Sequence, residues 1–101
     1  MGTRENNVET YFDDEVKRVG GMTRKWVSPG HSGVPDRIVI IKGHVWFVEI
    51  KTSDGIVSTP QQREINRLRK HGAAATVVRG HTGVDSFIRE AVRDINPRTV
   101  Y

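Results

Sequence analysis

The chain has 101 residues, of which 36% are hydrophobic and 28% are charged, and its formal net charge is +4 at pH 7. This length leaves no room for a second core, so we expect one domain over residues 1–101, with polar tails at 1–6 and 96–101. The absence of cysteine excludes disulfides and thiolate zinc sites. The positive charge suits a polyanionic partner such as nucleic acid.

No apolar run approaches the ~20 residues that a membrane-spanning helix needs, and the polar N-terminal stretch is unlike a secretory signal. The four histidines show no paired metal-ligand spacing. We therefore expect an intracellular, cytoplasmic protein without membrane association.

The first predicted helix begins after Asn7, a suitable N-cap, and carries apolar residues at helical spacing up to Val19, before Gly20-Gly21 ends it. Two of its acids are candidates for a functional site. Glu15 lies nearer the centre of the apolar stripe and Glu9 on its flank, so the pattern slightly favours Glu15. Either acid also fits an exposed helical position.

A strand is predicted at 22–27, followed by a loop at 28–33 that is rich in turn residues. Lys25 in this strand, and Ser28 and His31 in the loop, are candidates to contact a nucleic-acid backbone. A solvated lysine and a plain connecting loop explain the same residues.

The stretch from Val34 to Lys51 predicts a β-hairpin. Its two apolar, β-branched runs are 38–41 and 45–50, and Gly43 lies at the turn between them. A turn centred on Lys42-Gly43 places residue 36 opposite residue 49, whereas a turn centred on Gly43-His44 places residue 36 opposite residue 51. Which of these registers forms is left open by the sequence.

Three charged residues interrupt this hairpin, namely Asp36, Glu49 and Lys51. Side chains alternate across a strand, so both registers bring all three to one face. Two carboxylates on such apolar strands are costly to desolvate without a partner. A divalent metal between Asp36 and Glu49 would be such a partner, with Lys51 beside its water or a scissile phosphate. The pattern therefore indicates metal-assisted phosphodiester hydrolysis.

Ser58 is predicted to cap the next helix, and Gln61 completes a capping box with it. Gln61 shares a face with Ile65 and Leu68, whereas Gln62 is rotated by roughly 100° from it. Gln61 is thus the glutamine expected to face the sheet, either as part of the helix cap or as a residue that supports catalysis.

Basic residues on this helix point outward. Arg63 and Arg67, with Arg69 and Lys70, could follow a DNA backbone or could simply be solvated. Arg37, a further candidate for DNA binding, follows Asp36 on the opposite face of its strand, where an ion pair elsewhere in the fold explains it at least as well as a catalytic role does.

A strand at 73–78 and a helix at 82–94 complete the chain. The strand should run parallel to the strand of Glu49, because a strand, helix and strand in succession form a right-handed crossover. The expected fold is α/β, with the order α-β-β-β-α-β-α and a mixed central sheet flanked by helices.

Pro35-Asp36 followed by Glu49-Ile50-Lys51 resembles the signature of the PD-(D/E)XK nucleases. The longer string from Ser28 to Arg37, together with Ser58-x-x-Gln61, is similar to small stand-alone VRR-NUC proteins, which phages often encode. The resemblance covers 8–92 and implies a restriction-endonuclease-like core.

The resemblance also implies a site that uses Mg²⁺, with Mn²⁺ as a substitute. In it, Asp36, Glu49 and the Ile50 carbonyl bind the metal, and Glu9 is the acid of the first helix. Lys51 acts on the attacking water or on the phosphate, and Gln61 positions Lys51 or the water.

The same resemblance implies a homodimer that cleaves four-way (Holliday) junctions, in the host cytoplasm if a phage encodes the protein. One alternative is a repair or replication nuclease that acts on flaps or nicked duplex with a helicase partner in trans. The other is a basic DNA-binding module without activity, in which the charged residues form only an ion network.

Overall fold

The computed structural model describes residues 4–93, and the predicted tail residues at 1–3 and 96–101 lie outside this range. The elements follow in the order α1 (Arg4–Arg18), β1 (Met22–Lys25), β2 (Arg37–Ile41), β3 (His44–Lys51), α2 (Thr59–Lys70), β4 (Ala74–Arg79) and α3 (Gly80–Arg93). The predicted α-β-β-β-α-β-α order is confirmed.

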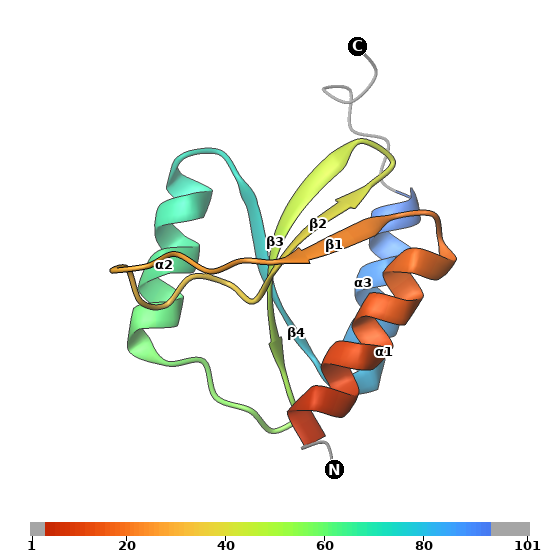
Figure 1. The fold of residues 1–101 in the computed structure, drawn as a ribbon, viewed down its shortest axis with the longest axis horizontal. Helices are drawn as coiled ribbons and strands as arrows, with labels where there is room; N and C mark the ends of the chain where they lie inside the picture. Colours follow the sequence, from red (N-terminus) through yellow and green to blue (C-terminus); the bar gives the residue numbers. More distant parts are fainter. Residues whose placement is uncertain (1–3, 94–101) are drawn as a thin grey trace.

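The four strands form one mixed sheet in the order β1-β2-β3-β4. β1 pairs with β2, and β2 with β3, in antiparallel fashion, whereas β3 and β4 run parallel as the crossover argument predicts. Figure 1 shows α1 and α3 on one side of this sheet and α2 on the other. The three layers explain why the strands carry apolar residues on both faces.

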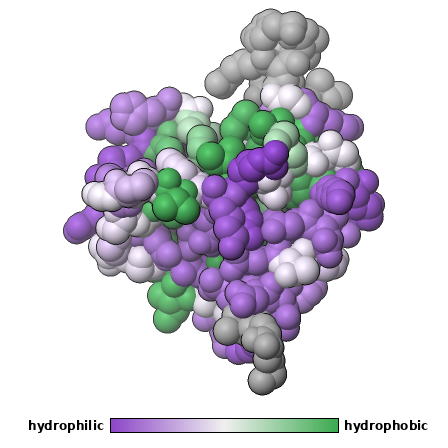
Figure 2. All heavy atoms as spheres, in the orientation of Figure 1, coloured by the Kyte–Doolittle hydropathy of each residue, from purple (hydrophilic) through white to green (hydrophobic). Residues whose placement is uncertain are grey.

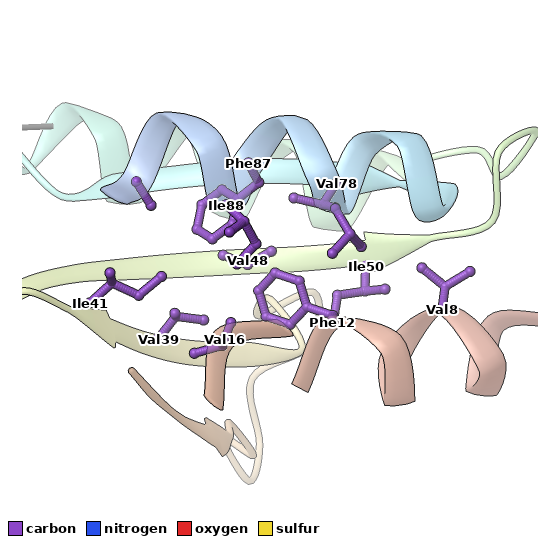
Figure 3. Packing of buried hydrophobic residues seen from close by; sticks show 12 residues of the cluster. Val8, Phe12, Val16, Val39, Ile41, Val48, Ile50, Val78, Phe87 and Ile88 are labelled. Carbon is purple, nitrogen blue, oxygen red and sulfur yellow. The ribbon is translucent and has the colours of Figure 1, made fainter. Parts of the chain in front are cut away.

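The main core lies between the sheet and the α1–α3 pair (Figure 3). Alternate residues of the hairpin point into it, namely Val39 and Ile41 from β2 and Val48 and Ile50 from β3. Phe12 of α1 is fully buried against them. Since successive side chains of a strand face opposite ways, residues 36 and 49 must lie on the α2 side of the sheet.

The hairpin turn consists of Lys42 and Gly43, with φ angles of 52° and 78°. Two successive residues with positive φ are typical of a type I′ turn, whose twist matches that of the strands. Ile41 pairs with His44 across it. The turn is therefore centred on Lys42-Gly43, the first of the two predicted registers.

Three predicted boundaries are wrong by two to four residues. α1 begins three residues before Asn7, so residues 4–6 are helical rather than part of a tail. The negative charge of Glu5 in this first turn stabilises the helix through its interaction with the helix dipole. β1 ends at Lys25 because Val27 has left the sheet and is 77% exposed. The last helix begins two residues early. Within the described range, no helix is long and apolar enough to cross a membrane.

Candidate active site

Asp36 and Glu49 face each other at the open end of the β2–β3 hairpin. Arg37 pairs with Val48, so the same register carries residue 36 to a position opposite residue 49. The Ile50 backbone N–H donates a hydrogen bond of 2.9 Å to Asp36 Oδ2, which fixes this carboxylate against β3. The predicted sharing of one face by residues 36, 49 and 51 is thus confirmed by the register.

The Glu49 carboxylate is 2% exposed and contacts two other side chains of the site. Its Oε2 accepts a hydrogen bond of 2.9 Å from Gln61 Nε2 and lies 3.4 Å from Lys51 Nζ. Its Oε1 is buried, and within residues 4–93 no hydrogen-bond partner reaches it. A buried carboxylate oxygen without a donor is costly, so this atom is available to a cation.

Two effects make the Glu49 carboxylate hard to ionise. Burial, and after it the negative charge of Asp36, raise its pKa from 4.5 to about 7, although Lys51 lowers it. One lysine thus offsets only part of the cost of placing two acids together. A divalent cation between the acids would remove the repulsion that remains.

Gln61 caps α2 and also contacts Glu49. Its backbone N–H donates to Ser58 Oγ at 3.3 Å and its Oε1 accepts from the Ser58 N–H at 2.9 Å, which forms the capping box. This orients the amide so that its NH₂ group points to Glu49. Gln62 instead bonds to Asn66 on the helix surface.

The structure does not bring Glu9 or Glu15 to this site. Glu9 Oε1 lies 3.0 Å from Arg37, which points toward α1 on the opposite face of the sheet from Asp36. Glu15 pairs with Arg18 on α1 at 2.9 Å. The choice of Glu9 as the acid of the first helix therefore needs correction, because its carboxylate is already bound to a buried guanidinium.

Arg37 is also not placed to contact DNA. It is 4% exposed, and Asp13 binds its Nε at 3.0 Å while Glu9 binds its Nη2. These ion pairs raise the pKa of Arg37 although burial opposes them. Arg37 joins β2 to α1, as the ion-pair interpretation of the sequence anticipated.

Glu5, in the first turn of α1, was missed by sequence reasoning. Its negative charge makes a small contribution to the raised pKa of Glu49, after burial and the charge of Asp36. The helix that the sequence predicts begins after Asn7 and leaves Glu5 in the polar tail. Residues 4–7 carry no apolar side chain, so the apolar pattern contains no signal for this first turn.

In the described range, no three histidine, aspartate or glutamate side chains converge closely enough to hold a metal ion. The donors at hand are the carboxylates of Asp36 and Glu49 with the neighbouring Ile50 backbone. Mg²⁺ commonly binds through one or two carboxylates and keeps several waters. The unpartnered Glu49 oxygen and the acid pair fit such an ion.

The remaining candidate contacts to nucleic acid differ in position, exposure and partners. Lys25 pairs with Arg37 across β1 and β2, so its side chain lies on the α1 side of the sheet, opposite the acid pair. Lys25 and Arg63 are exposed, and Ser28 is half-buried. Two others share one partner, because His31 and Arg67 both contact Glu64 of α2, at 2.9 and 3.1 Å.

The raised pKa of Glu49 predicts how stability without divalent metal depends on pH. The native state retains a proton on Glu49 that the unfolded chain loses, so this residue stabilises the fold below pH 4.5 and its contribution falls until about pH 7. The loss amounts to about 3 kcal/mol. Urea denaturation at pH 5 to 8, with chelator present, should show this fall in wild type and a flatter profile in Glu49→Gln. Glu90→Gln, at an exposed position of α3, is the control, and parallel profiles in all three proteins would contradict the assignment.

Comparison with known proteins finds a relative by sequence and similar folds among solved structures. No family model matches the sequence. A curated phage protein, "Putative nuclease p44" from Acyrthosiphon pisum secondary endosymbiont phage 1, is 44% identical over 69 residues, which are 67% of this chain and 68% of that protein.

Solved structures share the fold. A structure named "VRR_NUC domain" superposes with a TM-score of 0.82 at 38% identity and covers 87% of this chain and 97% of its own. A "VRR_NUC domain protein" matches with a TM-score of 0.74 at 24% identity, over 92% and 91% of the two chains. Hjc, a Holliday junction resolvase from Archaeoglobus fulgidus, matches with a TM-score of 0.57 at 18% identity, over 74% and 67%.

Proposed function

Because the chain belongs to the VRR_NUC family of nucleases, we propose that it is an endonuclease that hydrolyses DNA phosphodiester bonds with Mg²⁺ or Mn²⁺. The observation that carries the proposal is the buried Glu49 carboxylate. It faces Asp36, contacts Lys51 and Gln61, and keeps one oxygen without a hydrogen bond in the described part of the chain.

Asp36, Glu49 and the Ile50 carbonyl would hold the cation. When bound, a divalent cation lowers the pKa of a water molecule and stabilises negative charge that develops on a phosphate. Lys51 would orient or deprotonate the attacking water, or would neutralise charge on the phosphate. Gln61 would fix the Glu49 carboxylate through its amide N–H, so that the cation-binding oxygen keeps one orientation.

Glu5 takes the role of the first-helix acid in this proposal. Its substitution by glutamine should weaken Mn²⁺ binding about tenfold, as loss of an outer partner of a metal site does. Glu9→Gln is the matched control, since Glu9 binds Arg37, and it should lower the melting temperature while Mn²⁺ affinity is unchanged. Isothermal titration calorimetry measures the Mn²⁺ affinity of both variants, and thermal denaturation measures their melting temperatures. Weaker Mn²⁺ binding in Glu9→Gln alone would return the role to Glu9.

The proposed substrate is branched DNA, above all the four-way junction. The net charge of +4 and the fold shared with a Holliday junction resolvase support this choice. Flaps or nicked duplex, cut together with a helicase in the cell, form the second candidate, and an inactive DNA-binding module is the third.

A cleavage panel of labelled junction, flap, nicked and linear DNA, each with Mg²⁺ or chelator, tests the proposal. We expect paired incisions in the junction that need Mg²⁺ and disappear in Lys51→Ala. Preferred cutting of flaps or nicked duplex would favour the second candidate. Mn²⁺ binding that Asp36→Ala does not change, without cleavage of any DNA, would favour the inactive module.

The proposed assembly is a homodimer, because resolving a junction takes two incisions and each chain offers one acid pair. Three exposed apolar residues form one row across the sheet, in which Met22 pairs with Ile40 and Ile40 with Val45. They are 42%, 36% and 42% exposed. Figure 2 shows hydrophobic surface over this hairpin. Val45 lies on the same face as Glu49, about 14 Å along β3.

Val45→Lys should convert the dimer into a monomer, because a two-fold axis at the row would bring two ammonium groups into an apolar contact. Light scattering at micromolar concentration measures the mass, and the junction assay should show single nicks in place of paired cuts. Thr10→Lys, at an exposed position of α1, is the control. A wild-type monomer, or a dimer that Val45→Lys leaves intact, would contradict this interface.

A further inference from the structure

Glu64 of α2 is a buried carboxylate that the proposed chemistry does not use. It is 8% exposed, and a buried acid is costly unless donors satisfy it. One of its donors is Arg67, one turn along the same helix, at 3.1 Å. The other is His31 Nε2, at 2.9 Å, in the loop between β1 and β2. The hydrogen bond from His31 is the main cause that lowers the pKa of Glu64.

The loop of His31 is closed at its base and rests on α2. At its base, the Trp26 N–H donates to the Asp36 carbonyl at 3.1 Å. Within it, the His31 N–H donates to the Ser28 carbonyl, also at 3.1 Å. At Gly33 (φ 87°), a Cβ atom would lie 2.6 Å from the Pro60 carbonyl oxygen at the start of α2. Only glycine permits this close approach.

The helix α2 thus holds two parts of the candidate site at once. Gln61, in its first turn, binds Glu49 on β3. Glu64, one turn later, binds His31 in the loop that leads directly into Asp36. The helix therefore fixes the loop relative to the acid pair.

We propose that Glu64 and His31 form a clasp that positions the loop 27–35 beside the acid pair, so that the loop is preorganised to contact the DNA backbone next to the cleaved phosphate. Both are positioning residues, because Glu64 acts through His31 and His31 through the loop. The inference rests on the proposed nuclease function for its substrate. Its physical basis is that a binding loop already held in place loses less conformational entropy when the ligand binds.

Glu64→Leu removes the acceptor at similar volume, and His31→Ala removes the donor. Each should raise KM for DNA about tenfold, with kcat changed less than about twofold, because binding and not chemistry is affected. The double variant should be no worse than either single variant, since both break one contact. Glu64→Gln keeps an acceptor oxygen and should restore most of the affinity. Glu90→Leu, an exposed position on α3, is the matched control.

A simple DNA contact by His31 gives a different result, since Glu64→Leu leaves the imidazole present. Unchanged KM in Glu64→Leu, with raised KM in His31→Ala, would therefore overturn the clasp. Additive effects in the double variant would overturn it as well.

Hydrogen–deuterium exchange without DNA tests the clasp independently of cleavage. Exchange of loop peptides that span 27–35 should rise several-fold in Glu64→Leu and His31→Ala, and should stay at the wild-type level in Glu64→Gln. Unchanged exchange in both clasp variants would overturn the clasp, and so would faster exchange with an unchanged KM. A wild type that cleaves no DNA would instead overturn the proposed nuclease function, while the exchange experiment would still decide the clasp.

Discussion

Replacing Asp36 by asparagine is expected to abolish divalent-metal binding and to reduce DNA cleavage by about 10³-fold or more. The asparagine oxygen can still accept the Ile50 N–H that Asp36 Oδ2 accepts at 2.9 Å, so the hairpin should keep its geometry. Without metal, the melting temperature should stay equal or rise, because the charge that opposes ionisation of Glu49 is removed.

This combination separates a metal site from a structural ion pair. Calorimetry with Mn²⁺, junction cleavage with Mg²⁺ and thermal denaturation with chelator should be measured on the same protein preparations. Asp14→Asn, at an exposed position of α1, should match wild type in all three. A large fall in the melting temperature of Asp36→Asn would indicate a structural role, and retained cleavage would refute the assignment.

Replacing Lys51 by methionine is expected to reduce cleavage about 10²- to 10³-fold while metal binding persists. The methionine fills similar space, but the ammonium beside Glu49 Oε2 is lost, and with it the charge that would act on the water or the phosphate. Since Lys51 lowers the pKa of Glu49, its loss raises that pKa. The assay should therefore be run at pH 8.5, above the pKa of about 7 that Glu49 has in wild type, so that a raised pKa in the variant has less effect on the comparison.

Lys17→Met, at an exposed position of α1, controls for the loss of one positive charge from the whole protein. It should weaken DNA binding only slightly, through the salt-dependent contribution of one cation. If Lys51→Met lost Mn²⁺ binding at pH 8.5, its role would be to hold Glu49 rather than to act on the substrate. An unchanged cleavage rate would remove Lys51 from the mechanism.

The local parts of the site could be predicted from the sequence. Gly43 between two β-branched runs predicted the hairpin, and strand alternation brought Asp36, Glu49 and Lys51 to one face whichever register formed. Ser58 and Gln61 predicted the start of α2 because a capping box involves only residues three apart. Each of these features depends on neighbours in sequence.

Interactions between distant segments could not be predicted in this way. The partners of Arg37 lie on α1, 24 residues before it in the case of Asp13, and His31 is 33 residues from Glu64. Whether such groups meet depends on how helices pack on the sheet, which periodicity does not fix. The same limit applies to the acid of the first helix: the choice between Glu9 and Glu15 depends on how α1 is rotated against the sheet, and Glu5 lies outside the helix that the sequence predicts.

The two-residue turn at Lys42 and Gly43 makes the acid pair sensitive to the length of the chain between its members. Deletion of a single residue there would leave too few residues for a two-residue turn, so the pairing would shift by one position and turn one strand's side chains to the opposite face. Asp36 and Glu49 would then be separated by the sheet itself, although both remain in the sequence. A protein with such a length change at this turn should be inactive, whereas the loop at 52–57, which lies between β3 and α2 and belongs to neither, should tolerate length variation far better.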